Sequence, residues 1–252
     1  MVTEEACVKT SFYQKEVEIG FCDCDPQHRV KPSVLCRIMA DLAGVAFAAR
    51  GMDHAMLWQK GYVFLLSRVS IRVARMPKAD EIVTASTWER AIQRAEYLRD
   101  FEFHDQSGAL LASGTTSWIL VNPFTRQILR PSEFDGELLP MPEKQADAPP
   151  CARLRLRAEE AEEVDSRKIY YSLLDGNGHV YNAVYADLAI DALPYQLCGK
   201  PLLEVQLNFC QEAKLGDELR MFRQLDGQAG TALVKGIVHG KDCFLCRVVY
   251  GQ

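Results

Sequence analysis

The stretch LDGNGHVYNAVY (residues 174–185) joins a polar, glycine-containing turn directly to an apolar segment. Over residues 182–197, apolar side chains recur at spacings of three and four, the period of a helix with one buried face. Glycines at 176 and 178 permit a tight turn ahead of that helix. The stretch therefore predicts a loop that ends at a helix N-terminus, where free N–H groups and a partial positive charge favour an anion.

The first half of the chain contains a second copy of this pattern. Shifted by 150 positions, the stretch DPQHRV (residues 25–30) lies over DGNGHV (residues 175–180), and the aspartate and the valine are retained. A helix pattern over residues 32–50 follows the first copy. Gln27 and Arg29 stand where the second copy has asparagine and histidine. We interpret the chain as a duplicated unit in which only the second copy kept the chemically useful residues.

Strand patterns follow each predicted helix. They cover residues 62–73, 81–90, 96–105 and 110–120 in the first half, and 202–209, 218–225, 229–239 and 243–250 in the second.

Between the halves, residues 141–165 are rich in proline and charge and are predicted to form a linker, with one candidate edge strand at 152–156. We therefore predict an α+β fold with an N-terminal domain (1–140) and a C-terminal domain (166–252). In each domain a long helix is wrapped by an antiparallel sheet.

The composition excludes several classes of function. A net charge of −5 argues against a nucleic-acid partner, which needs a basic face. No window approaches the ~18 apolar residues of a membrane span. The first ten residues have neither the apolar run of a secretory signal nor the acid-poor composition of a transit peptide, so we expect a cytoplasmic protein.

Nine cysteines are scattered along the chain. Cys243 and Cys246 lie in an apolar, strand-like run and not in a zinc-knuckle turn. We predict small buried thiols, no metal and no other cofactor.

Segment 174–185 is similar to the D-x-N-x-H-V-x-N-x-x-Y motif of acyl-acyl carrier protein (acyl-ACP) thioesterases. Further segments stand in the order seen in that family: Thr87-Trp88, Arg99-Asp100, Thr115-Thr-Ser-Trp118, Asn122, Thr125-Arg126 and residues 207–217. The resemblance covers about residues 12–250. It implies a double hotdog fold, acyl carrier protein as partner, and hydrolysis of fatty acyl-ACP to free fatty acid. Without a plastid transit peptide, the chain resembles bacterial members.

The resemblance also implies roles for four residues in the second half. Glu212 would activate water as general base, a contribution of roughly 10²- to 10⁴-fold. Asn177 and His179 would position the water or the thioester carbonyl, and Asp175 would orient them. Taken alone, each has an ordinary alternative. Asp175 and Asn177 could be turn and cap residues, His179 a half-buried histidine with satisfied hydrogen bonds, and Glu212 a solvated strand residue.

A cysteine nucleophile has little support in the sequence. Ala213 stands where many plant members have a cysteine directly after the glutamate, which excludes one there. Cys210 is the remaining candidate, because it would share a strand face with Glu212 if no bulge intervenes. We expect it to be a packing residue. No G-x-S-x-G motif is present, which disfavours a serine hydrolase.

The first copy lacks a carboxylate for the same chemistry. When the two copies are aligned, the residue at the position of Glu212 is Met76 or Arg75, depending on a one-residue choice of register. Its helix and next strand are expected to line an acyl tunnel instead. The six candidates are Ile38, Met39, Leu42, Val45, Phe64 and Leu65, which are also typical of ordinary core. Each buried methylene adds ~0.8 kcal/mol, so the depth of the tunnel would set the preferred chain length.

An acidic carrier protein favours a basic docking surface, for which the first half offers Arg68, Arg72, Arg75, Arg90 and Arg94. Other functions stay open. They are a hotdog acyl-CoA thioesterase, a hotdog dehydratase or hydratase, which the order D-x-N-x-H argues against, and a non-catalytic acyl-binding hotdog. Hotdog units pair through their sheets, so the chain is expected to be a monomer or a homodimer.

Overall fold

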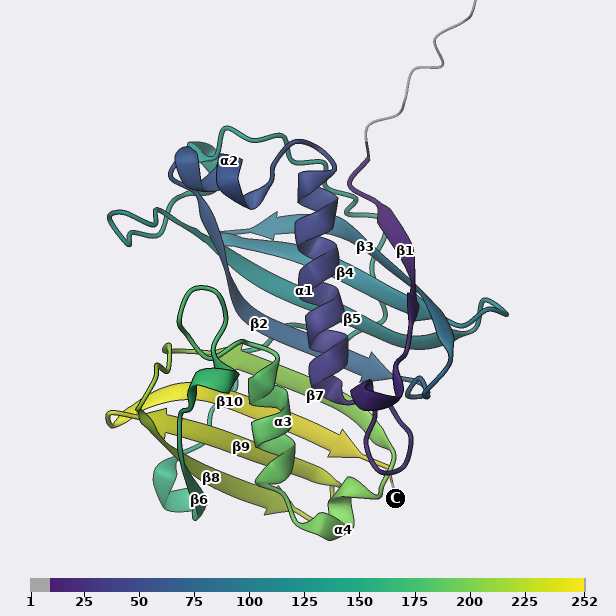
Figure 1. The fold of residues 1–252 in the computed structure, drawn as a ribbon, viewed down its shortest axis with the longest axis vertical. Coiled ribbons are helices and arrows are strands. Elements are labelled where there is room, and N and C mark those ends of the chain that lie inside the picture. Colours follow the sequence, from purple (N-terminus) through teal and green to yellow (C-terminus); the bar gives the residue numbers. More distant parts are fainter. Residues whose placement is uncertain (1–9, 252) are drawn as a thin grey trace, which may run out of the picture.

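The computed structural model describes residues 10–251 and shows one continuous sheet with two main helices on one face (Figure 1). The strands are β1 (Tyr13–Glu18), β2 (Val63–Val73), β3 (Ile82–Gln93), β4 (Glu96–His104), β5 (Leu110–Val121), β6 (Glu162–Lys168), β7 (Leu202–Phe209), β8 (Glu218–Asp226), β9 (Thr231–Val238) and β10 (Lys241–Tyr250). The α-helices are α1 (Pro32–Ala48), α2 (His54–Gln59), α3 (Val184–Asp191) and α4 (Tyr195–Cys198). Short 3₁₀ turns occupy Phe21–Asp23, Pro131–Glu133, Ala158–Glu160 and Tyr171–Leu173.

The sheet is built from two halves that have the same strand order. Across it the order is β1-β3-β4-β5-β2-β7-β10-β9-β8-β6, and all neighbouring strands are antiparallel. The two halves meet where β2 pairs with β7, with Ser70 opposite Gln206. Helices α1 and α3 contact each other on the same face (Figure 1). Among the described helices, none is long and apolar enough to cross a membrane.

The duplication extends to individual hydrogen bonds. In the first loop the Asp25 N–H donates to the Arg29 carbonyl (2.7 Å), and in the second the Asp175 N–H donates to the His179 carbonyl (2.8 Å). The N–H of Val30 then donates to Pro77, and that of Val180 donates to Ala213. Pro77 and Ala213 are therefore equivalent positions. It follows that Met76, and not Arg75, is the counterpart of Glu212.

The second unit has a shorter helical region than the first. The offset between equivalent residues falls from 150 at Asp25 and Asp175 to 136 at Met76 and Glu212, because α3 and α4 replace the longer α1 and α2. The single helix predicted over 182–197 is wrong. Pro194 has no N–H and fixes its own φ, so the chain stops after α3 and restarts as α4.

All eight predicted strands are present, with small differences at their ends. Two strands were not predicted, β1 and β6, because each is a charged edge strand without apolar alternation. The edge strand predicted at 152–156 is wrong. This segment has no ladder partner, and the Asn208 side chain holds it by accepting from the Leu154 N–H (2.7 Å) and donating to the Ala152 carbonyl (3.1 Å).

Candidate active site

The loop before α3 is held together by the Asp175 carboxylate. Its Oδ1 accepts hydrogen bonds from the backbone N–H groups of Asn177 (2.8 Å) and His179 (3.3 Å). Gly178 has a φ of +77°, a conformation that favours glycine. Asp175 thus fixes the backbone of the loop. Within residues 10–251, the exposed Asn177 side chain makes no hydrogen bond, so its amide is free to contact a ligand.

His179 and Glu212 come together across two segments of the second unit. The His179 Nε2 lies 3.1 Å from the Glu212 Oε2. A β-bridge between His179 and Lys214, next to the hydrogen bond from Val180 to Ala213, fixes this contact. The two side chains are 26% and 38% exposed, so both are partly buried and both can meet water.

A third residue reaches the same carboxylate from the first unit. The Arg126 Nη2 lies 3.4 Å from the Glu212 Oε2. Arg126 has a left-handed backbone with φ +60°, in a turn where the Asn122 side chain accepts hydrogen bonds from the N–H groups of Phe124 and Thr125. Sequence reasoning assigned this arginine no role. The only indication in the sequence was that Asn122 and Thr125-Arg126 are among the segments that resemble the family.

Cys210 does not share a regular strand face with Glu212. The N–H groups of Cys210 and Gln211 both donate to the Cys243 carbonyl (2.8 and 3.1 Å), so the strand is irregular just before Glu212. Burial raises the pKa of the Cys210 thiol, which disfavours the nucleophilic thiolate. Burial also raises the pKa of Cys243 to about 11, and its thiol donates to the Gln211 carbonyl (3.0 Å). The geometry supports packing roles for both.

An apolar cavity of about 260 Å³ lies in the first unit, between α1 and one end of the sheet. On α1 it is lined by Ala40, Ala43, Gly44 and Phe47, which share one helical face. The start of β2 adds Val63 and Phe64, and residues 138 and 140 help to close it.

Of the six predicted tunnel residues, only Phe64 lines this cavity. Ile38, Met39 and Leu42 are fully packed in the core, while Val45 and Leu65 are 39% and 46% exposed. The reason is physical. Large apolar side chains fill the space between a helix and a sheet, whereas an open cavity remains beside small ones.

The cavity lies next to the strand that leads to Glu212. Pairing of β2 with β7 puts Arg68 opposite Asn208. The side chains of Val63 and Phe64, at the start of β2, line the cavity, and the chain continues from the end of β7 to Glu212. The cavity therefore borders the β2–β7 boundary between the two units.

The predicted basic patch is largely neutralised within the chain. Arg68 pairs with Glu96, Arg72 with Asp147 and Glu204, Arg75 with Glu81 and Asp105, and Arg90 with Asp100. Of the five arginines, only Arg94 has no ion pair among the described residues. In the part of the chain that the structure describes, no three His, Cys, Asp or Glu side chains gather as they would around a metal ion.

Comparison with known proteins identifies relatives of both halves. The model of the acyl-ACP thioesterase N-terminal domain matches residues 10–134, and that of the C-terminal domain matches residues 156–242. A curated relative, the chloroplastic palmitoyl-acyl carrier protein thioesterase of Gossypium hirsutum, is 28% identical over 175 residues. The match covers 67% of this chain and 40% of the relative, so the chain spans less than half of that protein's length.

Three solved structures share the fold over nearly the whole chain. An acyl-ACP thioesterase from Bacteroides thetaiotaomicron has a TM-score of 0.87 at 21% identity, covering 96% of this chain and 98% of its own. A putative oleoyl thioesterase from Lactobacillus plantarum has a TM-score of 0.79 at 21% identity, covering 96% and 97%. The 12:0-ACP thioesterase from Umbellularia californica has a TM-score of 0.79 at 16% identity, covering 97% and 98%.

Proposed function

The chain belongs to the acyl-ACP thioesterase family, and from this premise we propose that it hydrolyses the thioester of fatty acyl-ACP and releases the free fatty acid. The observation that carries the proposal is the His179–Glu212 pair, at 3.1 Å, beside an apolar cavity. A partly exposed carboxylate next to an imidazole is suited to remove a proton from water. The cavity is suited to bury the acyl chain.

In the proposed mechanism, Glu212 is the general base. Its Oε2 is held by His179 and Arg126, and its Oε1 has no hydrogen-bond partner within residues 10–251. We assign Oε1 to the attacking water. The water oxygen bonds to the thioester carbon as Glu212 takes one proton from the water. The carbon–sulfur bond then breaks, and Glu212 returns this proton to the sulfur of the carrier, which leaves as a thiol.

The remaining residues position these groups. The Asn177 amide and the His179 imidazole are proposed to orient the water or the carbonyl, and Asp175 to hold their loop in shape. Arg126 brings a positive charge beside the forming oxyanion and keeps Glu212 in place. The site is then complete only when both units contribute.

We further propose that the fold is a double hotdog. Its domains would be residues 1–140, which bind the acyl chain, and 166–252, which carry the general base, with 141–165 as linker and β6 crossing the last boundary. The repeated strand order and the equivalent loops at Asp25 and Asp175 support two copies of one unit. One chain would form a complete catalytic unit, as a monomer or within a homodimer.

The test is hydrolysis of acyl-ACP and matching acyl-CoA substrates from C8 to C18 by the wild type and by Glu212→Gln. Met76→Gln is the matched control, because Met76 is the counterpart of Glu212 in the first unit. We expect release from acyl-ACP, a loss of at least about 100-fold in kcat for Glu212→Gln, and normal turnover by the control. Preference for acyl-CoA would identify the alternative carrier, and no turnover of either carrier would leave a non-catalytic acyl-binding protein.

A further inference from the structure

The cavity extends across four strands of the first unit. Its lining residues come from β2, β5, β4 and β3, which are consecutive neighbours in the sheet. Neighbouring strands lie about 4.8 Å apart, so three spacings cover roughly 14 Å. The Glu212 side of the sheet is next to β2, so β3 and β4 form the end of the cavity farthest from the proposed base.

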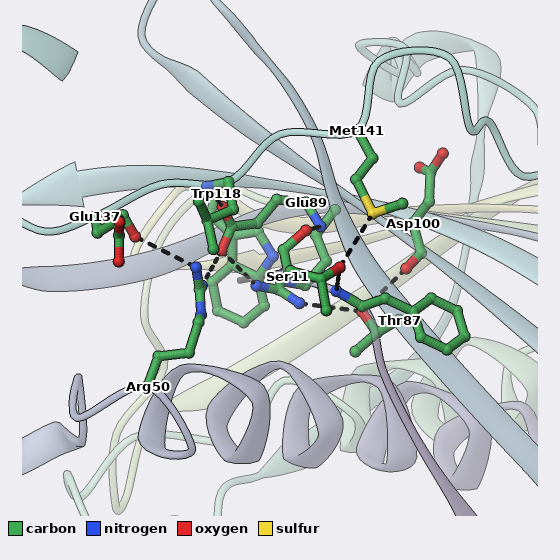
Figure 2. Close-up of polar contacts among 12 residues, drawn as sticks. Ser11, Arg50, Thr87, Glu89, Asp100, Trp118, Glu137 and Met141 are labelled. Atoms are coloured by element: carbon green, nitrogen blue, oxygen red, sulfur yellow. Dashed lines mark hydrogen bonds and ion pairs between the residues drawn. The ribbon is translucent and has the colours of Figure 1, made fainter. Parts of the chain in front are cut away.

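A buried charged cluster lines the far end of the cavity. Figure 2 shows Arg50 and Glu89 within this network of polar contacts. Glu89 and Arg99 are 7% and 4% exposed, and both line the cavity. One oxygen of Glu89 pairs with Arg50 and with Arg99 (3.2 Å), and the other accepts the N–H of Leu139 (2.7 Å). Burial lowers the pKa of Arg99 to about 10, so it is charged at neutral pH.

This wall resists displacement by an acyl chain. Separating Glu89 from either arginine would leave a buried charge without its partner, which is strongly unfavourable. The backbone of Met141 also donates to the Glu89 carbonyl (2.8 Å). The charged wall is thus tied to the segment around residues 138–141, part of which lines the cavity. The terminal methyl group of an acyl chain that reaches this wall cannot advance farther.

Phe47 narrows the cavity in front of the wall. The guanidinium carbons of Arg50 and Arg99 lie 5.1 and 5.2 Å from the centre of its ring, within the range of cation–π contacts. The Phe47 ring also packs edge-on against Phe64, with ring centres 5.4 Å apart. These contacts fix the ring, which lines the cavity from α1.

Gly44 leaves open space on the same face of α1. Glycine is the least favourable helix residue apart from proline. A Cβ at position 44 would meet no atom within 4 Å, so packing does not require the glycine. Gly44 is an exposed residue that lines the cavity, so a side chain at this position would have room at the cavity's rim.

We propose that Phe47, backed by the Arg50–Glu89–Arg99 cluster, is the residue that limits acyl chain length, and that Gly44 is the residue that admits the chain. An extended saturated chain advances roughly 1.25 Å per carbon for C–C bonds of about 1.5 Å. The roughly 14 Å between β2 and β3 therefore fits a medium-length acyl group of about ten to twelve carbons. This inference rests on the proposed thioesterase function and adds the class of acyl group.

The first experiment measures kcat/KM for acyl-ACP from C6 to C18. The wild type is expected to gain roughly fourfold per added methylene up to about C12, and then to lose activity. Phe47→Ala is expected to move the optimum to about C14–C16 and to raise the C14-to-C10 ratio at least about tenfold. Gly44→Leu is expected to move the optimum to about C8 or below, while the helix keeps its stability because leucine favours a helix over glycine.

Two controls separate chain selection from damage to the fold. Phe101→Ala removes a fully buried ring that does not line the cavity, and Ala48→Leu enlarges an exposed α1 residue away from it. Neither should move the optimum. If Phe47→Ala does not fold, Phe47→Leu replaces it. A wild-type optimum at C16–C18, or an optimum that none of the position-44 and position-47 variants moves, would overturn the proposal.

Binding of free fatty acids tests the same proposal without turnover. Trp118 lines the cavity, so tryptophan fluorescence can follow titration with C8 to C16 fatty acids. Affinity is expected to peak near C12 in the wild type and to shift with the two substitutions as activity does. If the enzyme assay is silent but binding shows this pattern, the thioesterase function fails and the chain-length limit stands. Binding that rises steadily to C16 would overturn the limit.

Discussion

At the residue scale, the central feature is one carboxylate oxygen that faces two nitrogen donors from different units. The Glu212 Oε2 lies 3.1 Å from His179 and 3.4 Å from Arg126. The contact with Arg126 is a charge-assisted hydrogen bond, which is stronger than a neutral one. The two contacts hold the carboxylate at Oε2, and its second oxygen is left to act on water.

Replacing Arg126 with methionine is expected to lower kcat by roughly tenfold, with a smaller change in KM. The effect is limited because Arg126 is 72% exposed and solvent screens its charge. Arg94→Met is the matched control, since both arginines have a left-handed backbone (φ +60° and +58°) and only Arg126 contacts Glu212. Steady-state kinetics with acyl-ACP would show the difference. Arg126→Lys should recover part of the rate, and equal kinetics for the Arg126→Met and Arg94→Met variants would contradict a positioning role.

Thiol chemistry is expected to be irrelevant to turnover. Burial raises the pKa of Cys36 to about 12 and that of Cys243 to about 11, so at pH 7 the thiolate fraction of each is about 10⁻⁴ or less. Iodoacetamide at pH 7 should leave both unmodified in the folded protein. Their labelling should increase only as the pH rises toward 11, which peptide mapping by mass spectrometry would detect.

Cys210→Ser should keep kcat within about twofold, and a large loss would revive a cysteine mechanism.

Sequence and structure differ most instructively at the cavity. The residues of the loop and the carboxylate could be predicted because a motif carries them. The Arg126 contact could not, because it joins positions 86 residues apart in the chain. Most of the predicted tunnel residues lie outside this cavity, because apolar periodicity finds space that side chains fill, as at Leu42, and not space beside small residues such as Gly44.

At the scale of elements, the two copies differ mainly in their helices. The α1 helix has 17 residues and α3 has 8, with Pro194 between α3 and α4. The C-terminal part of the longer α1 lines the cavity of the first unit. Periodicity predicted α1 correctly. It extended the second helix too far, because apolar spacing continues through Pro194.

In the first copy, the residue equivalent to His179 joins the two units. The Arg29 guanidinium donates to the carbonyls of Cys198 (2.7 Å) and Lys200 (3.1 Å), and it pairs with Asp25 (2.8 Å). These carbonyls lie at the C-terminal end of α4, where a cation is favourable. The duplicated loop has thus become a structural contact between the units.

Arg29→Met is therefore expected to lower the free energy of unfolding by about 2 kcal/mol, because several hydrogen bonds from a charged, mostly buried donor are lost. Turnover should change little. Arg37→Met, which removes an exposed pair with Asp23, is the control and should cost at most about 1 kcal/mol. Urea denaturation followed by circular dichroism measures both. Equal destabilisation by the two variants would show that the contact with α4 adds nothing.

At the scale of the whole molecule, the linker is part of the fold. Its composition predicted a linker at 141–165 but not its contacts. The Trp88 indole donates to the Lys144 carbonyl (2.7 Å), and the Asp100 carboxylate accepts the Ala146 N–H (3.0 Å). Farther along, Asn208 of the second unit holds residues 152 and 154. Such contacts come from the tertiary arrangement, so local proline and charge patterns do not reveal them.

Separating the halves is expected to abolish activity. Fragments 1–157 and 158–252 would each expose a central strand, β2 or β7, whose backbone groups pair only with the other half along that edge. Splitting the chain also parts Arg126 from Glu212. Each fragment alone should be poorly soluble, whereas co-expressed fragments should co-purify and hydrolyse acyl-ACP.

The control for this split is an intact chain with a protease site inserted between residues 157 and 158 and cleaved after folding. It should stay associated and active, because the β2–β7 pairing and the Arg29 contact hold the halves together without the covalent link. Turnover by the isolated C-terminal fragment at the wild-type rate would contradict a site built from both units. Activity that appears only when the halves are joined or mixed is the result that the shared sheet predicts, because the first unit supplies both Arg126 and the acyl cavity.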